Sequence, residues 1–206
     1  PEGVAEVTNG VNATYRQDRT YRTGHHGEDL LPPALGVLAH KTIVPGIILD
    51  DGDLKITAYI ASHPPIHPAV GYRFDYRGRS VVISGDSNVT SETLKIVDGA
   101  DLLLHDALSL PTVTALSEAL GEVGQSRQSK IVSDVMDYHA STDALIVLAE
   151  QSNVDMVAFY HLVPVPPNSV VEDIFMRGAP DNFLLTEDLM WFDLPIDSDD
   201  IIVHRP

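Results

Sequence analysis

The chain has 206 residues, 44% hydrophobic and 21% charged, so it is long enough and apolar enough to bury a core. It contains no cysteine, which excludes disulfides and thiolate ligands and leaves histidine and carboxylate groups to hold any metal. Thirteen basic residues against thirty acidic ones give a formal charge of −17, which disfavours nucleic acid and other polyanionic partners.

Residues 1–45 show weak hydrophobic periodicity, with breaks at Gly24 to Gly27 and at Leu31 to Pro33. We interpret this region as loop and short helix. The pair His25-His26 leaves two alternatives open, a substrate pocket or, more commonly for histidines in a glycine-bounded loop, plain surface.

From Gly46 the pattern becomes that of paired strands. Ile47 to Leu49 and Leu54 to Ile60 flank the turn Asp50 to Asp53, which predicts a hairpin whose second strand leads to His63. The prolines between Pro64 and Pro68 predict a rigid loop after His63, because proline fixes the backbone. His67, in this loop, is a rival metal ligand or a plain loop histidine.

A second hairpin is predicted from Val70 to Ile83, with its turn at Arg77-Gly78. Its last strand ends in Ser84-Gly85-Asp86-Ser87. An isolated turn aspartate of this kind is usually a solvated surface residue. The histidines and carboxylates that end other elements favour a functional interpretation of Asp86.

The rest of the chain alternates helices with strands. We predict helices at Ser91 to Val97, twice within 111–137, at Asp143 to Glu150 and at Ser169 to Arg177, and strands at 101–104, 154–160 and 189–192. Two of these strands end in His105-Asp106 and His161, and His139 just precedes a helix that Ser141 or Thr142 can cap.

Ligands commonly bind at the carboxyl ends of strands, where loops converge without breaking the sheet. Imidazole nitrogen and carboxylate oxygen are the usual ligands of zinc-like ions, and a carboxylate can bridge two cations. The pattern therefore predicts a metal site, with Asp86 between the ions. His105 is expected to be structural rather than catalytic.

The stretch from about Gly46 to His161 resembles the C-terminal half of the metallo-β-lactamase superfamily, in its ribonuclease Z-like branch. The landmarks in chain order are His63 with Gly71-Tyr72-Arg73, Ser84-Gly85-Asp86-Ser87, His105-Asp106-Ala107-Leu108, His139-Ala140-Ser141-Thr142 and Tyr160-His161. The third has Asp106 where the branch has Glu and Leu108 where it has Thr.

The resemblance implies an α/β fold, a four-layer αββα sandwich of which this chain is mainly the C-terminal half. It implies two divalent ions, zinc or alternatively manganese, held in part by His63, Asp86 and His161, with a metal-bound hydroxide as nucleophile. His139 would be catalytic, and Asp106 would orient it. Aspartate is one methylene shorter than glutamate, so Asp106 has a shorter reach toward His139 than the branch's Glu.

The branch's motif His-x-His-x-Asp-His does not occur in these 206 residues. We therefore expect residues 1–206 to form a single domain that is the C-terminal portion of a larger one, inactive and weakly metal-binding alone. Within it we expect a loop and helix region over 1–45, sheet and helices over 46–193 and an acidic tail over 194–206. Any signal peptide would precede Pro1, so the compartment stays open.

The predicted function is metal-dependent hydrolysis of a small ester, namely a phosphodiester, sulfate ester or lactone. The acidic charge and the lack of the branch's basic, glycine-rich arm disfavour nucleic acid, and no apolar run approaches the roughly 20 residues that span a membrane. A serine-hydrolase elbow and a phosphate-binding loop are absent from the sequence. The alternative is an inactive fragment that serves as an interaction or dimerisation module, and a homodimer is compatible with either function.

Overall fold

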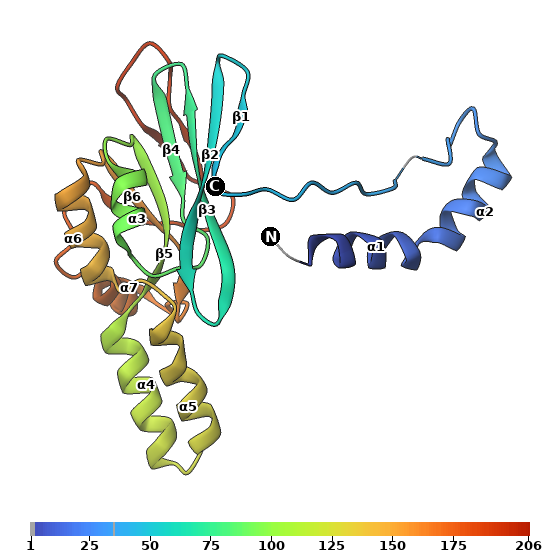
Figure 1. The fold of residues 1–206 in the computed structure, drawn as a ribbon. Coiled ribbons are helices and arrows are strands. Elements are labelled where there is room, and N and C mark those ends of the chain that lie inside the picture. Colours follow the sequence, from blue (N-terminus) through green and yellow to red (C-terminus); the bar gives the residue numbers. More distant parts are fainter. Residues whose placement is uncertain (1–2, 35) are drawn as a thin grey trace. The chain divides into compact units, whose positions relative to one another are not determined.

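The computed structural model describes residues 3–34 and 36–206, which fall into two compact units, Pro1–Val44 and Pro45–Pro206. The first unit contains the helices α1 (Val4–Thr14) and α2 (Arg16–His26) (Figure 1). The sequence predicted loop and short helix here, and the structure has two helices of 11 residues each, followed by loop. Valines at helical spacing begin α1, and α2 continues through Gly24 and ends at Gly27, whose φ is 86°.

The second unit is built on a seven-stranded sheet in the order β1 to β7. The first four strands form an antiparallel meander, and β4, β5, β6 and β7 pair in parallel. The strands are β1 Gly46–Asp50, β2 Leu54–His63, β3 Ile66–Tyr76, β4 Arg79–Ile83, β5 Leu102–Leu108, β6 Met156–Val163 and β7 Phe183–Leu185.

Five α-helices and one short 3-10 helix connect the later strands of the described part of this unit. They are α3 Ser91–Val97, α4 Leu110–Glu122, α5 Ser126–Asp134, η1 Val135–Asp137, α6 Thr142–Ser152 and α7 Ser169–Phe175. Local chemistry sets their starts: Thr90, Ser141 and Asn168 accept hydrogen bonds from the first turns of α3, α6 and α7. Helices α4 and α5 form a hairpin that projects away from the sheet (Figure 1).

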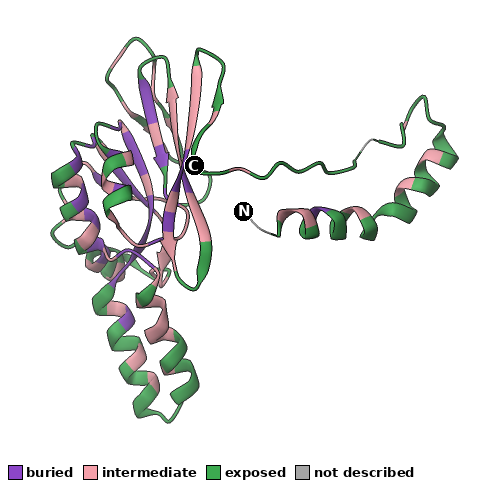
Figure 2. Cartoon of the chain, viewed as in Figure 1, coloured by how far each residue is buried: buried purple, intermediate pink, exposed green. Residues whose placement is uncertain are grey.

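The core lies between one face of the sheet and the helices. Strand pairing aligns Val82, Leu103, Val157 and Phe183 in one row across four strands. Helix α6 packs Leu145 and Leu148 against this row, and α3 and α7 add Val97 and Phe175. Figure 2 shows the buried residues gathered along the central strands and the inner side of α6. This burial fixes which residues of β5 and β6 face away from the helices.

The opposite face of the sheet is also apolar. The row that alternates with the first contains Tyr72, Ile83, Leu104 and Ala158, and Ile83 is 36% exposed. A sheet that is apolar on both faces is typical of strands covered on both sides. The described residues thus provide a sheet and one helical layer, the α/β arrangement of the expected sandwich's C-terminal half.

Several boundaries differ from the predictions. Strands β5 and β6 continue beyond His105 and His161, to Leu108 and Val163, because they pair with each other past the site. The strand β7 was not predicted, and β9 (Ile202–His204) falls within the expected acidic tail, where it pairs with β8 (Trp191–Asp193). Short strands of this kind are defined by their partners rather than by local pattern. In the described part of the chain, none of the helices has the length and apolar character to cross a membrane.

Candidate active site

The histidine and aspartate residues predicted from the sequence are carried by separate elements. His63 is the last residue of β2, and Asp86 lies in the loop after β4. Asp106 lies in β5, His161 lies in β6, and His139 precedes α6. The His139 ring lies between two others, with centroid distances of 5.3 Å to His161 and 5.7 Å to His63. The fold therefore brings these segments to one place, although they span about half of the sequence.

His161 approaches Asp86 across the ends of β6 and β4. Its Nε2 lies 3.5 Å from Asp86 Oδ2, and the two side chains are 46% and 41% exposed. His161 has a positive φ of 44° and sits at a β-bulge, where the pairing with β5 skips one residue. A bulge re-aims a side chain, and positive φ is uncommon for histidine. This local irregularity directs the imidazole toward Asp86.

Asp106 pairs with His139 in spite of its shorter side chain. The His139 Nδ1–H donates to Asp106 Oδ2 over 2.8 Å, and Asp106 is fully buried. The other carboxylate oxygen accepts a hydrogen bond of 3.0 Å from the backbone N–H of Ser87, the residue after Asp86. One buried carboxylate thus contacts both His139 and the loop that carries Asp86.

Two neighbouring residues were missed by the sequence reasoning. The ring of Tyr138 lies 4.8 Å from that of His63 and 4.9 Å from that of His139. Asn88 donates its backbone N–H to Ser62 O over 2.8 Å and its side-chain amide to Asp137 O over 2.7 Å. The only sequence signal for either was a nearby site residue: Tyr138 directly precedes His139, and Asn88 lies two residues after Asp86. Asn88 connects the end of β2 with the segment that leads to His139.

Tyr160 lies close to both carboxylates of the site. Burial raises the pKa of its phenol, and the negative charges of Asp106 and Asp86 raise this pKa further. Hydrogen bonds with Ser84 and Gly85 oppose the shift. The phenol therefore stays neutral and protonated at neutral pH.

The imidazole and carboxylate groups of the site are of the chemical types that bind divalent ions. Ligands about 2.1 Å from a tetrahedral ion lie roughly 3.4 Å apart, close to the separation of His161 Nε2 and Asp86 Oδ2. Within residues 3–34 and 36–206, however, no three His, Cys, Asp or Glu side chains form a group able to hold an ion. His63, Asp86 and His161 could thus supply only part of a metal site.

A cavity of about 610 Å³ adjoins His161. Its walls come from β6, α7 and the segment after β7, and include Tyr160, Pro166, Glu172, Leu185, Glu187 and Asp188. Glu187 lies 3.3 Å from the Arg205 guanidinium, so Glu172 and Asp188 are the carboxylates that repel anions here unless a cation offsets them.

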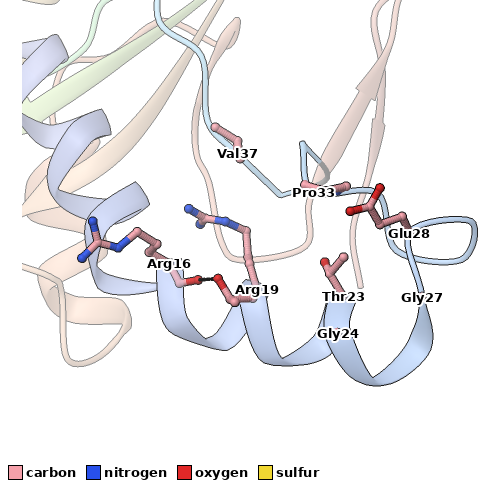
Figure 3. Close-up of a pocket in the computed structure, with 9 residues that line it drawn as sticks. Arg16, Arg19, Thr23, Gly24, Gly27, Glu28, Pro33 and Val37 are labelled. Atoms are coloured by element: carbon pink, nitrogen blue, oxygen red, sulfur yellow. Dashed lines mark hydrogen bonds between the residues drawn. The ribbon is translucent and has the colours of Figure 1, made fainter.

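A second cavity, of about 580 Å³, lies within the N-terminal unit (Figure 3). It is lined by α2 and the following segment, including Arg16, Arg19, Thr23 and Glu28. His25 and His26 do not line it, so this cavity gives no support to their alternative as pocket residues. His67 is exposed on β3, in a strand that begins directly after the Pro64-Pro65 turn rather than in the longer loop predicted.

Curated proteins resemble most of the chain. Ribonuclease Z from Mycobacterium avium is 29% identical over 164 residues, 80% of this chain and 54% of the relative. Ribonuclease Z from Mycobacterium tuberculosis is also 29% identical over 80% of this chain, and 55% of its length is covered. The chain is similar to the ribonucleases Z. It spans just over half the length of these relatives, and no model of a known protein family matches it.

Solved structures share the fold of this chain. A diphosphatase of the PhnP family superimposes with a TM-score of 0.50 at 17% identity, covering 78% of this chain and 51% of the other. Zn²⁺-bound PqqB from Methylobacterium extorquens also gives a TM-score of 0.50, at 14% identity, covering 82% of this chain and 57% of the other. The fold is therefore of the metallo-β-lactamase type. Similarity to proteins named ribonucleases also makes doubtful the expectation, drawn from charge, that nucleic acid is an unlikely partner.

Proposed function

We propose that this chain carries part of the active site of a metal-dependent hydrolase that cleaves phosphodiesters. The observation that carries the proposal is the convergence of His63, Asp86, His139 and His161 on one sheet edge, with the buried Asp106 behind them. Acid–base catalysis and metal binding both need such groups within reach of one reacting centre. The ribonuclease Z-like sequence supports phosphodiester chemistry over sulfate-ester or lactone hydrolysis.

Each residue has a role that its position permits. His63, Asp86 and His161 would hold divalent ions, zinc or alternatively manganese, together with further ligands from outside this set. When bound, the ions would activate a water molecule and take up negative charge that develops on the phosphate. His139 keeps its Nδ1 proton on Asp106, so its Nε2 is the atom free to exchange a proton with the leaving group or the water.

Asp106 orients His139. A buried carboxylate bonded to imidazole Nδ1–H fixes the ring's tautomer and direction. Tyr138 restricts the same ring from the side by contacting both His139 and His63. The geometry therefore suits a proton donor at a fixed position rather than a mobile one.

For the substrate, we propose a small phosphodiester. The chain's formal charge is −17, and the cavity beside His161 is lined by Glu172, Glu187 and Asp188. Both features oppose a long polyanion. RNA is the second candidate, favoured by the sequence similarity to ribonucleases Z.

Metal content tests the proposal. In the natural gene product that contains these residues, plasma mass spectrometry should find about two zinc or manganese ions per chain, as in two-metal sites. Asp86→Ala should lower the content, whereas Asp197→Ala, an exposed change in the acidic segment, should not. A metal-free gene product that folds and self-associates would instead establish the interaction-module alternative.

A further inference from the structure

His105 is a buried histidine with no role in the proposed chemistry. It lies in β5, directly before Asp106, with no exposed surface. Its Nδ1 makes a hydrogen bond of 2.9 Å with the backbone oxygen of Asp106 and lies 2.9 Å from Asp106 Oδ1. Both carboxylate oxygens of Asp106 therefore have an imidazole nitrogen within 3 Å, because Oδ2 meets His139 Nδ1 at 2.8 Å.

These contacts determine where His105 carries its proton. A backbone oxygen and an ionised carboxylate oxygen accept hydrogen bonds but cannot donate them. A lone pair on Nδ1 would be repelled by both oxygens, so Nδ1 must carry the hydrogen. The other nitrogen, Nε2, is buried and has no hydrogen-bond partner among the described residues. A hydrogen on Nε2 would have no acceptor, which favours the tautomer that has its hydrogen on Nδ1.

Asp106 is restrained on both sides by these donors. Ser87 N–H and His105 Nδ1 lie on Oδ1, and His139 Nδ1–H lies on Oδ2. The backbone N–H of Asp106 also donates to Ser84 Oγ over 3.3 Å. Rotation of the carboxylate would break contacts with at least two donors at a fully buried position, which is costly. The contacts therefore hold Oδ2 in the direction of His139.

We propose that His105 is a positioning residue, a neutral Nδ1–H donor that holds the Asp106 carboxylate in place and so fixes the orientation of His139. The catalytic meaning of this role rests on the proposed function, but the tautomer and the coupling to His139 do not. A histidine that only filled space would need neither a defined tautomer nor an effect on His139.

The tautomer can be measured on the unmodified chain. Long-range ¹H–¹⁵N NMR correlations, recorded at neutral pH with a chelator present, distinguish the two neutral imidazole tautomers and the imidazolium. We expect the neutral Nδ1–H form for His105. An Nε2–H tautomer or an imidazolium at His105 would overturn the proposal, whether or not the protein binds metal or hydrolyses any ester.

The coupling to His139 needs a matched pair of variants. In His105→Asn the side-chain amide can replace the Nδ1–H donor, whereas His105→Leu fills similar space without a donor. The readout is the hydrogen exchange rate of His139 Nδ1–H in the metal-free chain. We expect about a tenfold faster exchange in His105→Leu, as for loss of one buried hydrogen bond, and a rate near that of the unmodified chain in His105→Asn.

Two results would contradict the coupling. One is an unchanged rate in a folded His105→Leu chain, and the other is an equal acceleration in both variants, which would indicate a structural role only. If His105→Leu does not fold, two measurements still test the proposal: the tautomer of His105 in the unmodified chain and the exchange rate of His139 Nδ1–H in His105→Asn. A faster exchange in His105→Asn than in the unmodified chain would also contradict the proposal. Failure of the proposed function would instead appear as absent metal and absent hydrolysis with the NMR results intact.

Discussion

Tyr59 is a buried phenol beneath the site. It lies in β2 at 6% exposure, and its hydroxyl has no hydrogen-bond partner among the described residues. Burial raises its pKa far above the ordinary value, and the negative charge of Asp106, together with that of Tyr160 once its phenol ionises at high pH, adds to the shift. The folded state therefore holds the phenol proton at a pH where the unfolded chain has lost it.

This shift predicts a loss of stability at high pH. Above about pH 10, the ordinary tyrosine pKa, the unfolded state binds fewer protons than the folded state, so the free energy of unfolding falls as pH rises. Below pH 10 the contribution of Tyr59 to the free energy of unfolding does not change with pH. Tyr59→Phe should remove the part of this decrease in the free energy of unfolding that Tyr59 causes. It should also stabilise the protein by about 1 kcal/mol at pH 7, because it deletes a buried hydroxyl that has no partner.

Urea unfolding at pH 7 and pH 10.5 measures both effects. Tyr21→Phe is the matched control, because Tyr21 is 71% exposed. It should leave the pH dependence of unfolding unchanged. An alkaline decrease of equal size in Tyr59→Phe and the unmodified chain would show that other groups cause it.

At the scale of residues, the sequence indicated several of the side chains that form the candidate site but not which residues they contact. Asp86, His139 and His161 could be singled out because turn and strand patterns place them at element ends. Tyr138 and Asn88 could not, because their partners His63, Ser62 and Asp137 lie far away along the chain or belong to another element. Contacts of this kind depend on the tertiary fold.

The pairing of β2 with β3 depends on one glycine. Gly71 lies opposite Tyr59 in the register, and a Cβ on Gly71 would lie 2.4 Å from the Tyr59 ring. Strand backbones cannot move apart at this point without breaking ladder hydrogen bonds. The pairing matters for the site, because β2 carries His63 at its end.

Gly71→Ala should therefore destabilise the second unit by about 2–3 kcal/mol, the cost of overpacking a core. The measurement is the free energy of unfolding in urea. Gly121→Ala in α4 is the control, since a Cβ there meets only Ser129 Oγ at an ordinary 3.6 Å. Alanine also favours a helix, so the control should be neutral or slightly stabilising. Equal effects of the two substitutions would mean that β2 and β3 adjust freely.

Most elements with local signals were predicted, although α1 and α2 were expected only as loop and short helix. The two hairpins, β1–β2 and β3–β4, follow from turn residues between β-rich runs, and the helices after residue 90 follow from caps and glycines. The three-residue strands β7 and β9 carry too little pattern, and pairing with neighbours defines them. The continuation of β5 and β6 past the site likewise depends on their mutual pairing.

At the scale of the whole chain, the net charge and the sequence similarity bear in opposite directions on the proposed substrate. The formal charge of −17 opposes a polyanion, while relatives with 29% identity are named ribonuclease Z. Exposed charges act over about 10 Å at ordinary ionic strength, so charges beside the site outweigh equal charges elsewhere. Glu172 and Asp188 line the cavity next to His161, whereas Asp197 and Asp199 do not line it.

Charge reversal separates local from overall repulsion. Glu172→Lys with Asp188→Lys and, as control, Asp197→Lys with Asp199→Lys change the net charge equally. We expect the cavity pair to tighten binding of a short RNA by about tenfold at low salt, with much less gain at high salt, because screening shortens the interaction. Fluorescence anisotropy of a labelled RNA, measured on the natural gene product, gives both affinities. The tail pair should change them less than about twofold. Equal gains would mean that net charge alone opposes RNA, and no gain in either would mean that the acidic cavity does not select against it.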